Sequence, residues 1–201
     1  MSVTALGLCM AIAAASGGPA PLSDAKVRFA CEHSQTLIDA AKEYNLDPFT
    51  MAGLIYVESR WTADAVSRSN ACGLTQVLPK YAPETCKQLK VPKTSLYAGA
   101  RALQKWSTVR KWDRKLKKYV RVPRKGGMKV SLACYNAGNV CDGSKRGRSY
   151  SYKILKIGAW MEKWHKENPV VPLENSGSEV TYVFPVFEEI NHILYNPVFK
   201  F

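Results

Sequence analysis

The stretch DPFTMAGLIYVES, residues 47–59, carries the main prediction of the fold. Asp47 suits a helix N-cap, and Pro48 suits the first helical position, where its missing N–H group costs no hydrogen bond. Four residues that follow recur at i, i+3, i+4 and i+7, the spacing of one helical face: Met51, Leu54, Ile55 and Glu58. The stretch therefore predicts a helix whose apolar face carries a carboxylate, Glu58, near its C-terminal end.

A carboxylate on an apolar helix face has two interpretations. Burial disfavours the ionised form and raises the pKa of a carboxyl group, so Glu58 would suit a proton donor. Alternatively, Glu58 lies at the edge of the apolar face and pairs with a cation such as Arg60 or Arg68. Helical periodicity alone leaves both interpretations open.

Helical periodicity extends over most of the chain and predicts a mainly α fold. Besides the helix that ends near Glu58, helices are expected at about residues 23–45, 93–106, 130–137 and 150–166. The sequence thus predicts one helical domain at residues 23–168.

Both ends of the chain fall outside this expected domain. Residues 1–22 carry no charged side chain, and their apolar run ends in Ala13-Ala14-Ala15-Ser16. This pattern resembles a secretory leader with a small-residue cleavage site, and it is too short for a membrane-spanning helix, which needs about 20 residues. The alternative is an apolar N-terminal arm that packs on a partner. Residues 169–201 predict an extended, aromatic C-terminal arm with a short strand at 180–187, and both ends would suit docking in a multi-protein assembly.

Six cysteines bear on metal binding and on the redox compartment. They include no C-x-x-C pair and the histidines are scattered, so the sequence predicts no metal site, and no motif points to another cofactor. Cys72 with Cys86, and Cys134 with Cys141, are close enough in sequence to form disulfides, which would suit an oxidising compartment. Buried free thiols are the equally common alternative.

The chain is strongly basic, with 29 Lys and Arg residues against 16 Asp and Glu residues and a net charge of +13. Its partner is therefore expected to be anionic: a nucleic acid, lipid head groups or an acidic cell envelope. Residues 110–129 hold ten basic residues and one acid, Asp113. Trp112 and Tyr119 interleave with them, as in nucleic-acid stacking platforms. A solvated loop attracted to the anionic envelope is the favoured interpretation, and nucleic-acid binding is the less favoured one.

Four short motifs occur in the order and at the spacing of one enzyme family. They are ES at residues 58–59, ACGLTQVLP at 71–79, ACYNAG at 133–138, and Tyr152 ahead of Ile157. They resemble the E-S, G-L-M-Q, A-Y-N-A-G and Y-V motifs of the soluble lytic transglycosylase (SLT) family, whose fold is lysozyme-like. The resemblance covers roughly residues 31–164. It departs from the family pattern at Thr75 and Cys134, where Met and Ala are usual.

The resemblance implies a peptidoglycan lytic transglycosylase in which Glu58 is first the general acid and then the general base. Such an enzyme cleaves the β-1,4 bond between MurNAc and GlcNAc and leaves a 1,6-anhydro product, without a metal or another cofactor. Five further residues match family positions that contact the glycan or line its cleft: Ser67, Gln76, Tyr135, Asn136 and Tyr152.

Two other classes of function stay open. A lysozyme-type muramidase would hydrolyse the same bond, and hydrolases of this kind generally use two carboxylates. The nearby acids Asp64 and Glu84 match no second catalytic position of the family. The other class is a non-catalytic, glycan-binding structural module. The resemblance implies peptidoglycan as the partner, and a place in a virion or in the bacterial periplasm or cell envelope.

Overall fold

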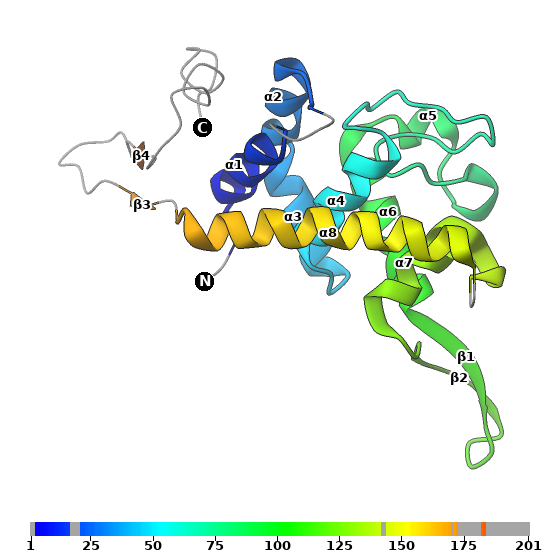
Figure 1. Cartoon of the computed structure of the whole chain (residues 1–201). Helices are drawn as coiled ribbons and strands as arrows, with labels where there is room; N and C mark the ends of the chain where they lie inside the picture. The colour runs from blue at the N-terminus through cyan, green and yellow to red at the C-terminus, as the bar shows by residue number, and fades with distance from the viewer. Residues whose placement is uncertain (1–2, 17–20, 142–143, 170, 173–181, 184–201) are drawn as a thin grey trace.

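The computed structural model describes residues 3–16, 21–141, 144–169, 171–172 and 182–183, and this part of the chain is mainly helical (Figure 1). Its α-helices are α1 (Ala5–Ala15), α2 (Asp24–Glu32), α3 (Ser34–Glu43), α4 (Pro48–Glu58), α5 (Cys86–Leu89), α6 (Pro92–Ser107), α7 (Gly127–Ala137) and α8 (Lys145–Glu167). Its 3-10 helices are η1 (Pro79–Tyr81) and η2 (Gly138–Val140). Its strands are β1 (Thr108–Asp113), β2 (Lys118–Pro123), β3 (Val171–Pro172) and β4 (Tyr182–Val183). The predicted mainly α fold is confirmed.

The aromatic C-terminal arm expected at residues 169–201 lies mostly outside the described residues. Within it, the structure describes Pro169 and the strands β3 and β4, which pair antiparallel. The expected strand at 180–187 is described only where β4 forms.

Helix α4 forms where the sequence predicted it and occupies the core. The side chain of Asp47 accepts a hydrogen bond from the Thr50 N–H group at 2.7 Å, which satisfies one of the free donors of the first turn. Residues 49–55 are all buried, so the helix is covered on every side and not only on its predicted apolar face. Glu58 is the last residue of this helix.

Two glycines allow α4 and α8 to pack closely. A Cβ atom at Gly53 would lie 2.7 Å from the backbone oxygen of Ile154, and one at Gly158 would lie 3.0 Å from that of Phe49. Contacts this short exclude larger residues unless the two helices move apart. The crossing, visible in Figure 1, brings the end of α4 next to the first half of α8.

Helix α8 begins at Lys145, ahead of the start that the sequence predicted near residue 150. The Ser144 side chain caps it by accepting a hydrogen bond from the Gly147 N–H group at 3.1 Å. Its buried residues form one face: Gly147, Ser151, Ile154, Gly158 and Met161. The prediction missed the first turn because that turn is polar and basic and carries no apolar periodicity.

The single helix predicted at residues 23–45 is two helices, α2 and α3, which meet at His33. The His33 backbone has φ −104° and ψ 4°, and its N–H group bonds to the carbonyl oxygen of Ala30. The buried Ser34 hydroxyl donates to that same oxygen at 2.9 Å. The prediction was wrong here because the apolar spacing continues across the break.

Helix α1 packs inside the helical domain, against α8 and α2. Residues 7–13 are buried, and the Cys9–Cys31 disulfide joins α1 to α2. A Cβ atom at Gly7 would lie 2.4 Å from the His165 ring of α8. In this structure the helix packs in the core of the chain itself. Whether residues 1–22 act as a leader or as an arm stays a prediction from the sequence. None of the described helices is both long enough and apolar enough to cross a membrane.

All six cysteines are paired. Cys72–Cys86 and Cys134–Cys141 are the pairs that the sequence spacing allowed, and Cys9–Cys31 is the third. The structure thus resolves the question of disulfides or free thiols in favour of disulfides. Cys72–Cys86 joins the loop that follows α4 to the start of α5. Cys134–Cys141 joins the C-terminal half of α7 to the residue that follows η2.

The basic segment forms a β-hairpin of β1 and β2, and not the solvated loop that the sequence suggested. The strands pair antiparallel, with Val109 opposite Val122. Val120 and Val122 are half-buried while their neighbours are exposed, which is the alternation of a strand. The many charges masked this pattern in the sequence. The hairpin projects away from the helical body (Figure 1).

Candidate active site

Glu58 and Tyr150 face each other where α4 ends and α8 begins. The Tyr150 hydroxyl donates a hydrogen bond to the Oε1 atom of Glu58. Burial raises the pKa of Glu58 to about 7, although the hydrogen bond from Tyr150 opposes part of that rise. Near neutral pH both the neutral and the ionised form of Glu58 are therefore present. The same carboxyl group can give a proton in one form and accept one in the other.

The structure favours the buried-acid interpretation of Glu58 over the ion-pair interpretation. The causes of its pKa shift are burial and the Tyr150 hydroxyl. The Arg60 guanidinium donates to the carbonyl oxygen of Pro21 and lies 5.9 Å from the centre of the Tyr56 ring. Arg68 is an exposed loop residue.

Tyr135 on α7 is a second tyrosine close to the acid. Its hydroxyl donates to the carbonyl oxygen of Thr75 at 2.7 Å. Burial and the negative charge of Glu58 both raise the pKa of Tyr135, so its hydroxyl keeps its proton. The bond ties α7 to the loop that carries residues 73–76.

Thr75 explains one departure from the family pattern. Its hydroxyl donates to the backbone oxygen of Ser95 on α6 at 2.8 Å, and its methyl group lies where a Cβ atom at Gly99 would be only 2.4 Å away. The side chain is fully buried. Threonine therefore anchors the loop to α6 through a hydrogen bond that a methionine side chain could not make.

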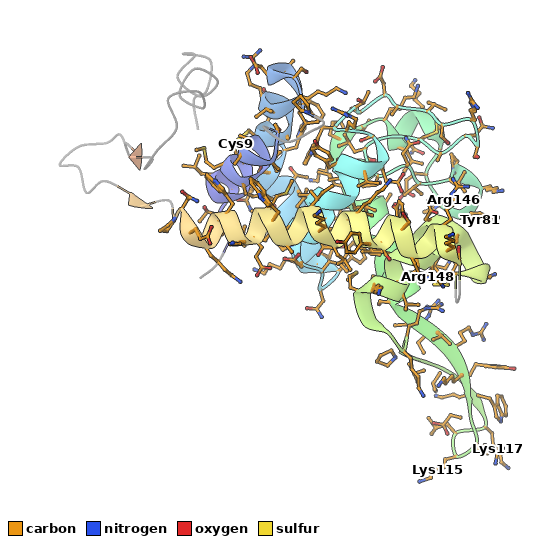
Figure 2. All side chains as sticks on the ribbon, viewed as in Figure 1. Cys9, Tyr81, Lys115, Lys117, Arg146 and Arg148 are labelled. Atoms are coloured by element: carbon orange, nitrogen blue, oxygen red, sulfur yellow. A yellow bond between two sulfur atoms is a disulfide. The ribbon has the colours of Figure 1, made fainter. Side chains whose placement is uncertain are left out.

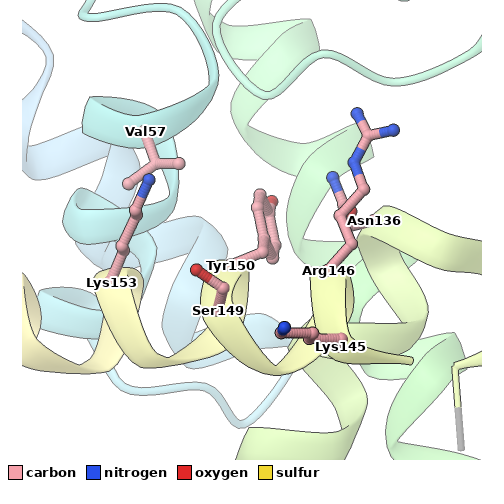
Figure 3. Close-up of a pocket in the computed structure, with 7 residues that line it drawn as sticks. All are labelled: Val57, Asn136, Lys145, Arg146, Ser149, Tyr150 and Lys153. Carbon is pink, nitrogen blue, oxygen red and sulfur yellow. The ribbon is translucent and has the colours of Figure 1, made fainter. Parts of the chain in front are cut away.

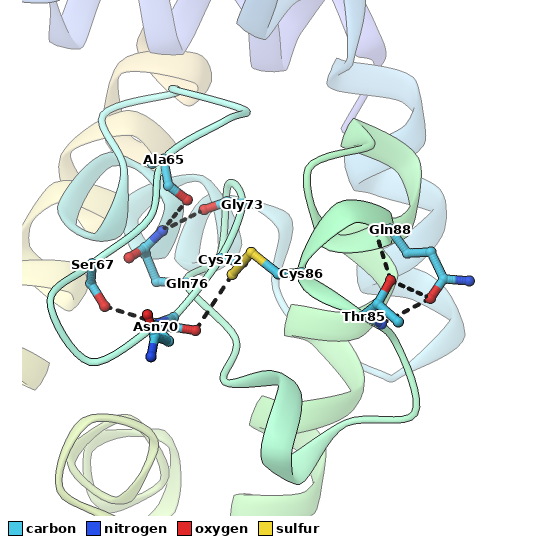
Figure 4. Close-up of a disulfide and its surroundings, with 10 residues drawn as sticks. Ala65, Ser67, Asn70, Cys72, Gly73, Gln76, Thr85, Cys86 and Gln88 are labelled. Carbon is cyan, nitrogen blue, oxygen red and sulfur yellow. Dashed lines mark hydrogen bonds between the residues drawn. A yellow bond between two sulfur atoms is a disulfide. The ribbon is translucent and has the colours of Figure 1, made fainter.

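Ser67 and Gln76 hold the shape of the loop between α4 and α5 (Figure 4). The Ser67 hydroxyl accepts a hydrogen bond from the Ala71 N–H group at 3.0 Å. The Gln76 amide group donates to the backbone oxygens of Ala65 at 3.1 Å and Gly73 at 2.9 Å. Their side chains thus bind their own loop in this structure, although the sequence resemblance predicted glycan contacts for both.

An open groove of about 580 Å³ is lined by Tyr150, the hydrogen-bond partner of Glu58, and by Val57, which precedes Glu58 in the chain. Seven residues from the end of α4, the end of α7 and the start of α8 line it (Figure 3): Val57, Asn136, Lys145, Arg146, Ser149, Tyr150 and Lys153. Asn136, predicted from the sequence, therefore lines the same groove as Tyr150. Three of the lining side chains are cations, so the groove suits a ligand with negative charge.

Tyr152, which the sequence resemblance placed in the cleft, points elsewhere. Its side chain is 63% exposed, and it does not line the groove beside Glu58. Residues two apart on a helix lie on nearly opposite faces, so Tyr150 and Tyr152 cannot both face α4. Tyr150 is four residues before the buried Ile154, and this spacing would have identified it from the sequence.

The described residues contain no cluster of three or more His, Cys, Asp and Glu side chains that could hold a metal ion. Glu58 can give and accept a proton, and the hydroxyl groups of Tyr135 and Tyr150 lie close to it.

Comparison with known proteins identifies relatives for most of the helical domain. Residues 35–157 match the family described as Transglycosylase SLT domain. A transglycosylase of Enterobacteria phage PRD1 is 28% identical over 128 residues, which are 61% of this chain and 41% of the phage protein. An X-ray structure of an inactive mutant of the lytic transglycosylase Slt from Pseudomonas aeruginosa is similar with a TM-score of 0.53 and 20% identity, over 73% of this chain and 26% of that chain.

These relatives are larger than the matched region. The chain spans less than half the length of the phage protein and about a quarter of the Pseudomonas chain. The structural likeness concerns the fold, and it confirms the lysozyme-like helical fold that the sequence predicted.

Proposed function

The chain belongs to the transglycosylase SLT domain family, and from this premise we propose that it is a peptidoglycan lytic transglycosylase with Glu58 as its acid and base. The observation that carries the proposal is the half-buried Glu58 carboxyl group, whose pKa is raised to about 7 and whose partner Tyr150 lines an open groove. A carboxyl group with this pKa donates and accepts protons near neutral pH, where general acid–base catalysis is most efficient.

The first step uses the neutral form of Glu58. Its proton passes to the glycosidic oxygen between MurNAc and GlcNAc, and the bond from that oxygen to the MurNAc C1 atom breaks. The acetamido oxygen of the same MurNAc bonds to C1 and takes up the positive charge. Proton transfer by a positioned carboxyl group contributes a factor of about 10² to 10⁴ to the rate.

The second step uses the ionised form that the first step leaves. The Glu58 carboxylate takes the proton of the MurNAc C6 hydroxyl, whose oxygen attacks C1 and displaces the acetamido oxygen. The product is a 1,6-anhydro ring, and Glu58 is neutral again. Protons balance over the two steps, and no water is consumed.

The Tyr150 hydroxyl supports the ionised form between the two steps. It donates a hydrogen bond to Glu58, and burial together with the negative charge of Glu58 raises the pKa of Tyr150 well above its ordinary value. Tyr150 therefore stays protonated and remains a donor when Glu58 becomes charged. Hydrogen bonds to a charged group are the stronger ones.

The positions of Asp64 and Glu84 favour transfer within the sugar over hydrolysis by water. Glu84 is bound to Arg101 at 2.6 Å, and Asp64 is an exposed loop residue. Neither carboxylate contributes to the pKa shift of Glu58, so neither offers the second carboxylate that most glycoside hydrolases use as a base toward water or as a nucleophile. The lysozyme-type muramidase is thus the second candidate.

The groove supports peptidoglycan as the substrate. The glycan carries the carboxylates of its stem peptides, and Lys145, Arg146 and Lys153 line the groove as cations. We assign Asn136 to a direct glycan contact. Ser67, Gln76 and Tyr135 would act on the glycan through the loop that they hold.

The proposed place of action is the bacterial cell wall, reached from a virion or from the periplasm. The phage relative and the net charge of +13 support this proposal. Protein partners would bind through the C-terminal segment, because α1 is packed in the core.

Digestion of purified sacculi, followed by mass spectrometry, tests the proposed function. The unmodified protein should release 1,6-anhydro muropeptides, Glu58→Gln should release at least a hundredfold less, and the control Asp64→Asn should act normally. Reducing-end products without the anhydro ring would instead identify a hydrolase. Equal turnover by the Glu58→Gln variant would exclude Glu58 as the catalytic acid. No turnover by the unmodified protein would identify a non-catalytic module.

A further inference from the structure

The β1–β2 hairpin combines charge with exposed apolar surface that the proposed function does not use. Three of the eight large hydrophobic side chains exposed among the described residues lie within it: Trp112, Leu116 and Tyr119. They are 53%, 57% and 59% exposed, respectively. Residues 110–129 also contribute nine of the thirteen net positive charges of the chain.

The base of the hairpin is fixed to the helical body. The Arg124 side chain donates to the carbonyl oxygen of Trp106 at 2.8 Å, and its backbone N–H group donates to Ser107 at 2.8 Å. The hairpin extends from there as a projecting finger, with Lys115 and Lys117 at its tip (Figure 2). The tip is thus held away from the groove beside Glu58.

One face of the hairpin presents two aromatic rings beside two arginines. Trp112 lies opposite Tyr119, and their rings pack edge to face with centroids 5.2 Å apart. One step further from the tip on the same face, Arg110 lies directly opposite Arg121, and both are exposed. The Arg110 guanidinium lies over the Tyr119 ring, 5.0 Å from its centre, and Arg121 donates a hydrogen bond to the Thr108 hydroxyl at 2.9 Å. This face therefore carries ordered cations next to aromatic surface.

The turn at the tip carries one apolar side chain among cations. Asp113 is occupied in shaping the turn, since its side chain accepts hydrogen bonds from the N–H groups of Lys115 at 2.8 Å and Leu116 at 2.9 Å. Leu116 stands exposed between Lys115 and Lys117. The finger thus has an apolar side chain at its tip and an aromatic pair behind the tip. Cations surround both.

We propose that this hairpin docks the protein on the surface of a bilayer that contains anionic phospholipids. Leu116 enters the boundary of the acyl chains, and Trp112 and Tyr119 lie at the level of the head groups, where amphipathic rings are favoured. The Lys and Arg side chains bind the lipid phosphates, and each one near the surface strengthens binding about fivefold. Docking would hold the groove that Tyr150 lines close to a bacterial membrane, and so close to the peptidoglycan next to that membrane.

A bilayer fits these residues better than a nucleic acid does. A single strand is bound in a groove that follows its backbone, on aromatic rings that stack on successive bases. Here the support is a projecting finger, and the two rings pack on each other. A nucleic acid would also leave the exposed Leu116 without a role.

Co-sedimentation of the full chain with vesicles tests the proposal, independently of glycan cleavage. The chain should bind vesicles of phosphatidylglycerol and phosphatidylcholine at low salt, and should not bind vesicles of phosphatidylcholine alone. Leu116→Ser, which keeps every charge, should weaken binding several-fold. Lys115→Gln with Lys117→Gln should weaken it by at least tenfold.

The matched control is Lys87→Gln with Lys90→Gln, which removes two exposed charges from the α5 region and should change binding by less than twofold. Equal losses in the control and in the hairpin pair would overturn the proposal, because diffuse charge would then explain binding. An unchanged affinity of Leu116→Ser would overturn it as well. Absence of phosphatidylglycerol-dependent binding, or tighter binding to a single-stranded oligonucleotide, would do the same. Circular dichroism confirms that each variant is folded.

Discussion

The Tyr150 hydroxyl on α8 donates a hydrogen bond to the Glu58 carboxyl group on α4, and so joins the two helices at the point where the groove begins. This contact lowers the pKa of Glu58 while burial raises it. The working pH of the site depends on the balance between the two effects.

Tyr150→Phe should shift that balance in a definite direction. Without the donor, the pKa of Glu58 rises above about 7, so the fall of kcat/KM at alkaline pH should move to higher pH. kcat should fall on the order of tenfold, because the ionised form loses a hydrogen bond to a charged group. Tyr152→Phe on the exposed face is the control and should match the unmodified protein. Identical pH profiles for all three proteins would contradict the assigned role of Tyr150.

Glu58 should also make the folded state less stable as the pH rises. Its pKa is about 7 in the folded protein and near 4.5 when exposed, so the unfolded chain releases this proton first. The stabilisation by Glu58 is fully present below pH 4.5 and is lost as the pH rises through 7. The loss in the free energy of unfolding is at most about 3 kcal/mol. Urea unfolding at pH 5 and pH 8 should show this loss in the unmodified protein and not in Glu58→Gln. A loss of equal size in both would assign it to other groups.

Gly53→Ala tests whether the close crossing of α4 and α8 positions the site. The added Cβ atom meets the backbone oxygen of Ile154, so the variant should lose about 1 to 3 kcal/mol in the free energy of unfolding and most of its activity. Ala159→Ser, at an exposed position of α8, should change neither quantity by a measurable amount. A Gly53→Ala variant of normal stability would mean that the two helices tolerate a wider spacing.

Lys153→Gln tests the cationic wall of the groove. Loss of this charge should raise KM for peptide-bearing glycan several-fold while kcat stays within twofold, because the proposed contact of Lys153 is with the peptide carboxylates and not with the reacting atoms. The control is Lys156→Gln, also an exposed position of α8 but not part of the groove lining. Equal KM values for the two variants would argue against a specific contact.

Local patterns in the sequence predicted α4 and the position of Glu58. They did not predict features that depend on contacts between distant segments or on a pattern masked by charge. The cap at Asp47, the proline after it and the apolar spacing are all contained in a dozen residues. By contrast, the burial of α1 depends on contacts with α8 and on Cys31, which no local pattern shows. The hairpin was hidden because its alternation of valines lies within a run of charges.

The sequence motifs located the candidate site but not every side chain that faces it. Motif matching proposed Glu58, Tyr135 and Asn136, and their roles stay predictions. It assigned the α8 tyrosine by its position in the motif and chose the exposed Tyr152, whereas Tyr150 is the tyrosine that contacts Glu58. Two residues along a helix reverse the face, so a small error in register moved the side chain from the groove to solvent.

Titration of Glu58 by carbon-13 NMR tests the central claim most directly. In protein labelled at the glutamate carboxyl carbon, the Glu58 signal is identified by its absence in Glu58→Gln. It should titrate with a midpoint near 7, and this midpoint should rise in Tyr150→Phe. A midpoint near 4.5 in the folded protein, unchanged in Tyr150→Phe, would contradict the claim that burial keeps this acid protonated for catalysis.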